Sequence, residues 1–452
     1  MAFEALTGTP QRTRCLPIVS FSSLESYEDE ESPFGPGCTN SPNAPEDACG
    51  PNARLMSKCV YTYEDRYTFA RILVADSLVF DSHFESGNLH SAFRVYPKDP
   101  STHSQCARYD LYMHPDLNTN GHTQWFFFSV SNMYRGQTVE FNLRNFTKSD
   151  SMYNYGMRPL LYSSTSGKWR RCGNSIHYYG PIANGASPFG DITSAYDSSK
   201  KKKGRAEDEL AGHKKKSSSS APASMYGLHF THTFEHSEDV CYFAYSCPYT
   251  HTDLQRRITS MMQEASIRRI MRRTLLCRSV GQNVCDLLTI TAPAISPAEI
   301  TRRVLVVITC RVHPGESSAS WIMDGILGYL SGDSPIAKML RTLYVFKIVP
   351  MLNPDGVING NYRTSLAGCD LNRRWYRPDV RLHPTIYHTK EMIRRLAKQY
   401  PNCILLDLHG HSRKEGIFIF GCMPEKKHLH TQKTAASAAK VPISLHPAHP
   451  NQ

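Results

Sequence analysis

The pattern of hydrophobic and polar positions divides the chain into two differently organised parts. From about Tyr61 to Tyr179 the sequence is aromatic and β-prone, with a short apolar run at Gln124–Val130 and strict alternation at Thr138–Leu143. Turn signals such as Asn120-Gly121 separate these runs. Short alternating strands that are punctuated by turns predict an antiparallel β-sandwich in this part of the chain.

The second part alternates strands with helices. Apolar, β-branched runs suited to strands that are buried on both faces occur at Val304–Thr309, Tyr344–Val349 and Cys403–Leu408. Between them, Ser317–Leu330 and Thr385–Tyr400 have the spacing of amphipathic helices. This alternation predicts a three-layer α/β domain with a mainly parallel sheet.

Composition adds the segments that flank and interrupt these two domains. Residues 1–55 are rich in Ser, Pro, Gly and acidic residues, which is typical of a disordered tail. We therefore predict a β-sandwich domain at 56–240, with a low-complexity Lys/Ser insertion at 183–223, and an α/β domain at 241–422. Residues 423–452 form a tail rich in Lys, His and Ala.

The net charge of +12 is concentrated in one place. Lys200–Lys216 contains seven lysines and Arg205 against three acidic residues, a net charge of +5. This concentration argues against nucleic acid as the partner, although the mildly basic remainder would attract an acidic one. The lysine clusters are interpreted as a solvated loop, with a nuclear-localisation role as the alternative.

Other features of the sequence indicate the cellular compartment in which the protein is found. No segment approaches the roughly 18–20 continuous apolar residues that span a bilayer, so no membrane association is expected. The 14 cysteines form no C-x-x-C pair, and residues 1–21 contain no secretory signal core. These features predict reduced thiols and a cytoplasmic protein, with nuclear entry as an open alternative.

Two polar clusters directly follow predicted strands. His313-Pro314-Gly315-Glu316 comes after Val304–Thr309, and His409-Gly410-His411 comes after Cys403–Leu408. Alone, the first could be a chance His-x-x-Glu and the second a satisfied buried histidine. The carboxyl ends of strands in an open α/β sheet are where ligands bind. Together His313, Glu316 and His409 supply two histidines and one carboxylate, the set that holds one zinc ion with a position left open.

A third group of polar residues lies between these clusters. It comprises Asn353–Gly356, Asn361–Arg363 and Asp370–Arg373. Each could be only a tight turn or solvated surface. Two arginines and an asparagine beside a zinc site could instead bind a carboxylate. This combination favours hydrolysis at the carboxyl end of a chain.

Four ordered motifs resemble the signature of the zinc carboxypeptidases, and more narrowly of the cytosolic branch that removes glutamates from tubulin. They are His313–Glu316, Asn353–Gly356, Asp370–Arg373 and Asp407–His411. The β-rich part resembles the domain that precedes catalysis in that branch, at Phe84–Leu89, Gln124–Phe126, Asn154–Met157 and Cys241–Tyr245. The resemblance runs from about Tyr61 to Cys422 and implies a carboxypeptidase-like α/β domain with a mixed, mainly parallel sheet.

The resemblance also implies roles for individual residues. His313, Glu316 and His409 would bind one Zn²⁺ ion, and Asp370 would orient the His313 ring. Arg363 would polarise the scissile carbonyl, while Asn372 and Arg373 would hold the terminal carboxylate of the substrate. Where digestive members have an arginine, this chain has Gly315, as in the cytosolic branch. No role is assigned to Arg374.

The general-base glutamate of the family has no counterpart here, since it lies on a strand well downstream of the last zinc ligand. Glu415, the one acidic residue between His409 and the Lys/His/Ala-rich tail, lies in a polar loop and is a poor substitute. We therefore expect the C-terminal part of the catalytic domain to be missing. We also expect this chain to bind zinc weakly or not at all and to turn over little substrate.

Three functions follow from these residues. The first is a zinc carboxypeptidase that removes C-terminal residues, glutamate foremost, from acidic protein tails such as those of tubulin in the cytoplasm. The second is a catalytically incomplete module that binds such tails. The third is a related zinc amidohydrolase that acts on small N-acyl amino acids, against which the long aromatic first domain argues.

Overall fold

The structure, a computed structural model, describes residues 56–63, 77–96, 106–119, 121–182 and 225–421. The predicted tail 1–55, insertion 183–223 and tail 423–452 lie outside these residues. The chain forms two units, Met1–Lys414 and Glu415–Gln452, and every element below belongs to the first.

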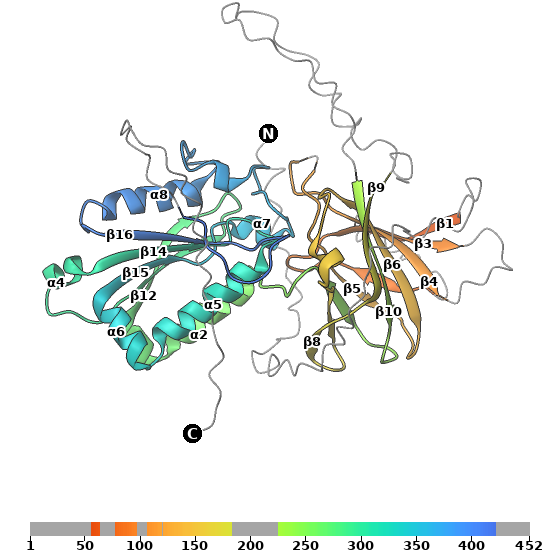
Figure 1. Cartoon of the computed structure of the whole chain (residues 1–452), viewed down its shortest axis with the longest axis horizontal. Helices are drawn as coiled ribbons and strands as arrows, with labels where there is room; N and C mark the ends of the chain where they lie inside the picture. The colour runs from red at the N-terminus through yellow and green to blue at the C-terminus, as the bar shows by residue number, and fades with distance from the viewer. Residues whose placement is uncertain (1–55, 64–76, 97–105, 120, 183–224, 422–452) are drawn as a thin grey trace, which may run out of the picture. The chain divides into compact units, whose positions relative to one another are not determined.

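Two sheets make up the β-rich half (Figure 1). The first has the order β1-β3-β4-β6-β10-β9 and the second the order β2-β5-β11-β7-β8. The strands are β1 Met56–Thr62, β2 Val79–Asp81, β3 Leu89–Tyr96, β4 Ala107–Met113, β5 Phe127–Ser131, β6 Thr138–Phe146, β7 Leu160–Ser163, β8 Lys168–Arg171, β9 Asn174–Ile182, β10 Met225–Thr233 and β11 Cys241–Ala244, with a 3₁₀ turn η4 at Met152–Tyr155.

An aromatic core joins the two sheets. Phe243 of β11 lies 5.1 Å, centroid to centroid, from Phe141 of β6 and 5.7 Å from Phe128 of β5. All three side chains are fully buried, which explains the alternation in Thr138–Leu143. Among the described strands of these two sheets, all pairs are antiparallel except β4 and β6, which pair in parallel. β11 pairs with β5 and β7, although it begins one residue beyond the predicted domain boundary at 240.

The second half is built on a five-stranded sheet of order β12-β13-β15-β14-β16. Its elements are α2 His251–Gln263, α3 Ala265–Ile270, β12 Met271–Arg278, β13 Val284–Ile290, α4 Pro297–Arg302, β14 Val304–Cys310, α5 Ser317–Ser331, α6 Pro335–Leu343, β15 Tyr344–Val349, α7 Pro354–Ile358, η5 Leu371–Arg373, α8 Pro384–Leu396 and β16 Cys403–Leu408.

The predicted mixed sheet is confirmed, but its mainly parallel character is wrong for the described strands. β14 pairs in parallel with both β15 and β16, whereas β12–β13 and β13–β15 are antiparallel. The difference comes from the hairpin β12–β13, whose basic sequence MRRTLLCR is not an obvious strand. A hairpin adds antiparallel neighbours without a crossover helix.

Helices cover both faces of this sheet, with α8 on one side and α2, α5 and α6 on the other (Figure 1). Successive residues of β14 point to opposite faces. Leu305 and Val307 belong to the core that includes residues of α8, while Val306 and Ile308 belong to the core that includes residues of α2 and α5. Val304–Thr309 is therefore buried on both faces, as its sequence predicts.

The prediction that Cys403–Leu408 is a buried strand is wrong. Among the described strands, β16 is the outermost of its sheet, and Ile404, Leu405 and Leu406 are 46%, 54% and 42% exposed. An apolar run indicates a strand that is suited to burial, but it does not show whether neighbours cover it. Within the described residues, β16 pairs with β14 alone.

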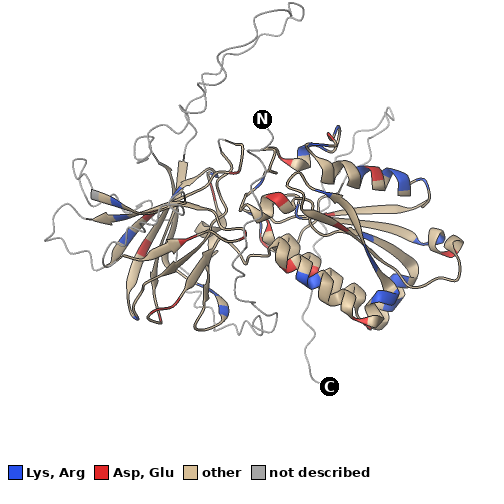
Figure 2. Ribbon diagram, turned by 180° about the vertical axis from the view of Figure 1, so that it is seen from behind, with Lys and Arg blue, Asp and Glu red and all other residues tan. Residues whose placement is uncertain are grey.

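Charged residues are distributed along the surface helices (Figure 2). Arg394 and Arg395 lie in the last turn of α8, where cations interact favourably with the helix dipole. No helix in the described residues combines the length and the apolar character that crossing a membrane requires.

The aromatic core predicts that two substitutions change the free energy of unfolding by very different amounts. Phe243→Ala should lower the free energy of unfolding by about 3–5 kcal/mol, because it empties the space between the sheets. Tyr134→Ala, at a side chain that is 63% exposed, should change it by less than about 0.5 kcal/mol. Urea denaturation of the two variants measures both values, and equal losses would contradict this account of the core.

Candidate metal centre

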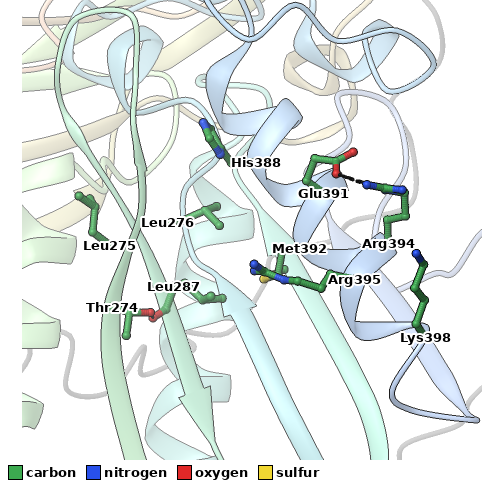
Figure 3. Close-up of a pocket in the computed structure, with 10 residues that line it drawn as sticks. All are labelled: Thr274, Leu275, Leu276, Leu287, His388, Glu391, Met392, Arg394, Arg395 and Lys398. Atoms are coloured by element: carbon green, nitrogen blue, oxygen red, sulfur yellow. Dashed lines mark hydrogen bonds and ion pairs between the residues drawn. The ribbon is translucent and has the colours of Figure 1, made fainter.

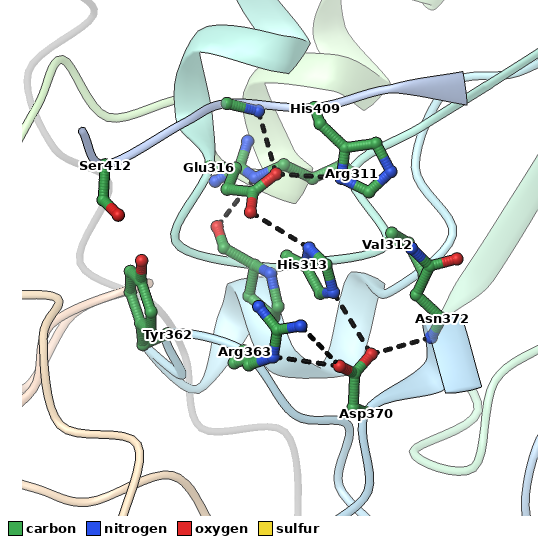
Figure 4. Close-up of polar contacts among 12 residues, drawn as sticks. Arg311, Val312, His313, Glu316, Tyr362, Arg363, Asp370, Asn372, His409 and Ser412 are labelled. Atoms are coloured by element: carbon green, nitrogen blue, oxygen red, sulfur yellow. Dashed lines mark hydrogen bonds and ion pairs between the residues drawn. The ribbon is translucent and has the colours of Figure 1, made fainter. Parts of the chain in front are cut away.

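Three predicted residues meet at the carboxyl ends of neighbouring strands (Figure 4). His313 follows β14, Glu316 is the residue before α5, and His409 follows β16. β14 and β16 are parallel, so their ends lie at the same edge of the sheet. One potential ligand atom from each side chain lies within 4.8 Å of the other two. The structure thus brings together residues that are 93 positions apart in the sequence.

The Glu316 carboxylate lies between the two imidazole rings. His313 Nδ1 is 3.0 Å from Glu316 Oε1, and His409 Nδ1 is 3.1 Å from Oε2. The backbone N–H of Gly410 also donates to Oε2, at 2.8 Å. Burial by itself would raise the pKa of Glu316, but the hydrogen bonds from His313 and His409 outweigh it and bring the pKa to about 2. Glu316 is therefore a carboxylate at neutral pH.

The other nitrogen of each ring is held by a second carboxylate. His313 Nε2 lies 3.1 Å from Asp370 Oδ1, and His409 Nε2 lies 2.7 Å from Asp407 Oδ2. Hydrogen bonds of this kind fix the orientation of a ligating ring and leave its Nδ1 toward the metal. Two imidazole nitrogens and the Glu316 carboxylate form a donor set that fits a zinc ion. The two outer carboxylates, Asp370 and Asp407, hold the rings in place.

Asp407 is the first residue of one of the four motifs, but the sequence analysis gave it no role. It precedes His409 by two residues on β16, and residues two apart point to the same face of a strand. This spacing is a signal that could have found it. The hydrogen bond to Asp407, and then that to Glu316, raises the pKa of His409 to about 10, so without a metal the ring carries a proton at neutral pH.

Arg363 connects to the same cluster through Asp370. Its Nε and Nη2 atoms lie 2.9 and 2.7 Å from Asp370 Oδ2, while Asp370 Oδ1 faces His313. Burial would raise the pKa of Asp370, but the hydrogen bond to His313 and the charge of Arg363 hold it far below its usual value. One carboxylate thereby fixes both the predicted ligand and the predicted carbonyl-polarising residue.

The predicted carboxylate clamp lies on the next turn. Asn372 and Arg373 belong to η5, whose first residue follows Asp370 directly. The Asn372 side-chain oxygen accepts a hydrogen bond from Trp375 Nε1 at 2.9 Å, and Arg373 is exposed. The structure places both near Asp370, but it shows neither in contact with the histidines. Their role stays a prediction.

Asp116, in the β-rich half, organises the loop that carries Arg363. Its carboxylate accepts the backbone N–H groups of Tyr362, Arg363 and Thr364, at 2.5, 2.7 and 2.7 Å, and the Thr364 hydroxyl at 3.1 Å. Asp116 is 2% exposed. No local sequence pattern marks this residue, since its partners lie 246–248 positions away.

Two further residues shape the loop between β14 and α5. Arg311 is buried, and its guanidinium donates to the carbonyls of Pro314 and Tyr249 at 2.7 and 3.0 Å. Gly315 lies against Tyr362, and a Cβ at this position would lie 2.5 Å from Tyr362 Cδ2. Any side chain at position 315 would therefore displace the Tyr362 ring. This close approach gives a local reason for the glycine that the sequence has there.

A hollow of about 420 Å³ lies elsewhere, between α8 and the hairpin β12–β13 (Figure 3). Its lining comprises Thr274, Leu275, Leu276, Leu287, His388, Glu391, Met392, Arg394, Arg395 and Lys398. Arg394 is paired with Glu391 at 2.8 Å. The hollow contains none of the predicted site residues, so we place the chemistry at the triad.

The two halves of the chain each match a known protein family. Residues 80–180 match the family described as cytosolic carboxypeptidase N-terminal domain. Residues 258–392 match the zinc carboxypeptidase family. The second match includes His313, Glu316, Arg363 and Asp370.

Curated relatives match most of this chain. Cytosolic carboxypeptidase 1 of Mus musculus is 39% identical over 396 residues, which are 85% of this chain and 29% of the relative. Cytosolic carboxypeptidase 2 of Homo sapiens is 40% identical over 353 residues, 77% of this chain and 34% of the relative. The chain thus spans only about a third of the length of these relatives.

Solved structures show the same fold. A metallo-carboxypeptidase from Burkholderia cenocepacia superposes with a TM-score of 0.52 at 22% identity, covering 74% of this chain and 71% of the other. A metallo-carboxypeptidase from Pseudomonas aeruginosa gives a TM-score of 0.50, also at 22% identity, with 74% and 69% covered.

The contacts of Asp116 predict a local loosening when its charge is removed. In Asp116→Asn, the backbone N–H groups of residues 362–364 lose a charged acceptor, so the free energy of unfolding should fall by about 1–3 kcal/mol. Amide exchange at these residues should accelerate, as measured by hydrogen exchange with mass spectrometry. Asp333→Asn, at a side chain that is 90% exposed, serves as the control and should leave both values unchanged. Unchanged exchange in Asp116→Asn would contradict the assignment.

Proposed function

The chain belongs to the cytosolic carboxypeptidase family, and we propose that it acts as a zinc-dependent carboxypeptidase on acidic protein tails. The observation that carries this proposal is the convergence of His313, Glu316 and His409, with each histidine held from behind by a carboxylate. His313, Glu316 and His409 would bind one zinc ion. When bound, zinc supplies a Lewis acid that polarises a carbonyl group.

The chain's own residues supply the rest of the chemistry. Asp370 keeps the His313 ring in the orientation that turns Nδ1 toward the metal position, and it also holds the Arg363 guanidinium beside it. Arg363 would donate hydrogen bonds to the scissile carbonyl as negative charge develops on its oxygen. Because its backbone is fixed by Asp116, the guanidinium needs little reorganisation to do so.

The substrate end would be bound by the turn after Asp370. Asn372 and Arg373 would hold the terminal carboxylate, for which an exposed guanidinium beside the site is suited. A basic chain with this clamp favours acidic tails, with glutamate as the residue that is removed. Tubulin tails in the cytoplasm, on the microtubule surface, are the substrate that we propose.

A second function has its own supporting observation. Within the described residues, the carboxylates that contact the histidines are Glu316, Asp370 and Asp407, and each is already engaged by a ring nitrogen. None of these three is available as a general base. The alternative is therefore a module that binds acidic tails through the same clamp without cutting them.

Zinc content and product release together test the proposed function. At saturating zinc the full chain should bind one equivalent and release free glutamate slowly from a peptide that ends in glutamates, because the carboxylates at the triad are engaged by ring nitrogens. His313→Ala should abolish both, because it removes a ligand. His122→Asn, at an exposed histidine, is the control and should keep both. Peptide binding without any glutamate release by the zinc-loaded chain would favour the binding module, and failure to bind zinc would refute the proposed enzyme.

The raised pKa of His409 predicts that zinc affinity depends on pH. Zinc must displace the proton that His409 carries, since its pKa without metal is about 10. Burial would lower the pKa of His313, but its hydrogen bonds to Asp370 and Glu316 outweigh burial and raise it. Affinity should therefore rise by at least about tenfold per pH unit from about pH 6 to about pH 8, with at least about one proton released per zinc ion. Calorimetry in buffers of different ionisation enthalpy measures the proton count. A pH-independent affinity in this range would contradict the protonation state given for His409.

A further inference from the structure

Lys148 is a cation of the β-rich half that reaches the edge of the metal centre. It follows β6 by two residues, and Tyr178 Oη donates to its backbone carbonyl at 2.6 Å. Its Nζ donates to the Tyr362 hydroxyl and, at 2.8 Å, to the Ser412 hydroxyl. Tyr362 directly precedes Arg363, and Ser412 lies three residues beyond His409.

The Lys148 ammonium group is hydrogen-bonded to hydroxyl oxygens, while Glu316, Arg363 and Arg413 act on it through their charges without bonding to it. Within the described residues, Lys148 forms no ion pair with a carboxylate, whereas Arg363 is paired with Asp370. Burial lowers the pKa of Lys148 to about 8, which still leaves it mostly protonated at neutral pH. A partly buried ammonium group that no carboxylate contacts directly is costly, so an anion that docks beside it recovers solvation energy.

The position of the Lys148 ammonium group determines which anionic part of a substrate can reach it. Tyr362 packs against Gly315 of the loop that carries His313 and Glu316, and its N–H is held by Asp116. In Figure 4 the hydroxyl groups of Tyr362 and Ser412 face each other beside the triad. Lys148 and Ser412 are only half-buried, so a ligand can approach them from solvent. The predicted clamp for the terminal carboxylate lies on a different turn, at Asn372 and Arg373.

We propose that Lys148, Tyr362 and Ser412 form a subsite for a second carboxylate of the substrate, namely the side-chain carboxylate of a glutamate or aspartate at or next to the end of the tail. The inference rests on the proposed function, because it concerns the substrate of the same site. Lys148 would bind the carboxylate, and the two hydroxyls would donate further hydrogen bonds to it. The β-rich half would thereby contribute to the preference for acidic tails.

Binding to the metal-free full chain tests the subsite without turnover. The probes are a fluorescent peptide that ends in a run of glutamates and a matched peptide in which each glutamate is glutamine, so that both keep the terminal carboxylate. The wild-type chain should bind the glutamate peptide about tenfold or more tightly than the glutamine peptide. Lys148→Met should remove this difference by weakening only the glutamate peptide.

Three further variants make the result specific. Lys148→Arg should keep most of the preference, because it retains the charge. Lys148→Gln keeps a hydrogen-bond donor toward the two hydroxyls, so it tests the charge even if Lys148→Met fails to fold. Lys168→Met, at an exposed lysine of β8, removes the same charge elsewhere and should leave the preference unchanged.

Equal affinity of the wild-type chain for the two peptides would overturn the subsite. A preference that survives in both Lys148→Met and Lys148→Gln, or that falls equally in Lys168→Met, would also overturn it. The proposed function fails separately, through absent zinc binding or absent glutamate release. A Lys148-dependent preference without release would support the subsite within the binding module.

Discussion

The buried carboxylate of Asp116 is the contact on which the geometry of the site depends. It accepts three consecutive backbone N–H groups, those of Tyr362, Arg363 and Thr364. Consecutive N–H groups that converge on one carboxylate define the course of the backbone between them. This loop is thus held in place by a side chain from the loop that follows β4, and it presents Tyr362 to Lys148 and Arg363 to Asp370.

Starting from Arg363 in this segment, side chains of opposite charge contact one another across the site. Arg363 pairs with Asp370, which faces His313, and His313 and His409 enclose Glu316. Asp407 is the last residue of this series, and it contacts the other ring nitrogen of His409. Each of the two histidines lies between two carboxylates and Arg363 is paired with Asp370, so the cluster can be half-buried without leaving an isolated charge. Arg311 donates to the Pro314 carbonyl in the loop that carries His313 and Glu316.

Local patterns predicted the elements that form the frame of the site. β15 has the predicted bounds Tyr344–Val349, and the predicted strands at Val304 and Cys403 lead to His313 and His409 as expected. Strand propensity and apolar runs are properties of adjacent residues, so a single sequence reveals them. The short motifs named the triad for the same reason.

What the sequence did not reveal depends on distant contacts. Asp116 and Lys148 act on Tyr362 across 246 and 214 positions, and neither belongs to a motif of metal-binding residues. The apolar run of β16 does not by itself reveal its exposure, because an apolar strand has the same sequence whether or not other elements cover it. The expectation that the C-terminal part of the catalytic domain is missing already implied an exposed apolar edge. The hairpin β12–β13 was missed because its arginines mask the strand pattern, although Arg273 is neutralised by Asp286 in the fold.

The place of β16 at the edge of the sheet also links metal binding to local stability. In the described residues this strand is held by pairing on one side, and it carries His409 at its end. Fraying of β16 would withdraw one ligand while His313 and Glu316 stay in place. Any ion that needs all three ligands therefore binds only when the strand is paired, and its binding energy is added to the stability of that edge. A bound metal ion would therefore hold β16 against β14. Metal binding should be detectable as slower hydrogen exchange of the backbone amides of β16.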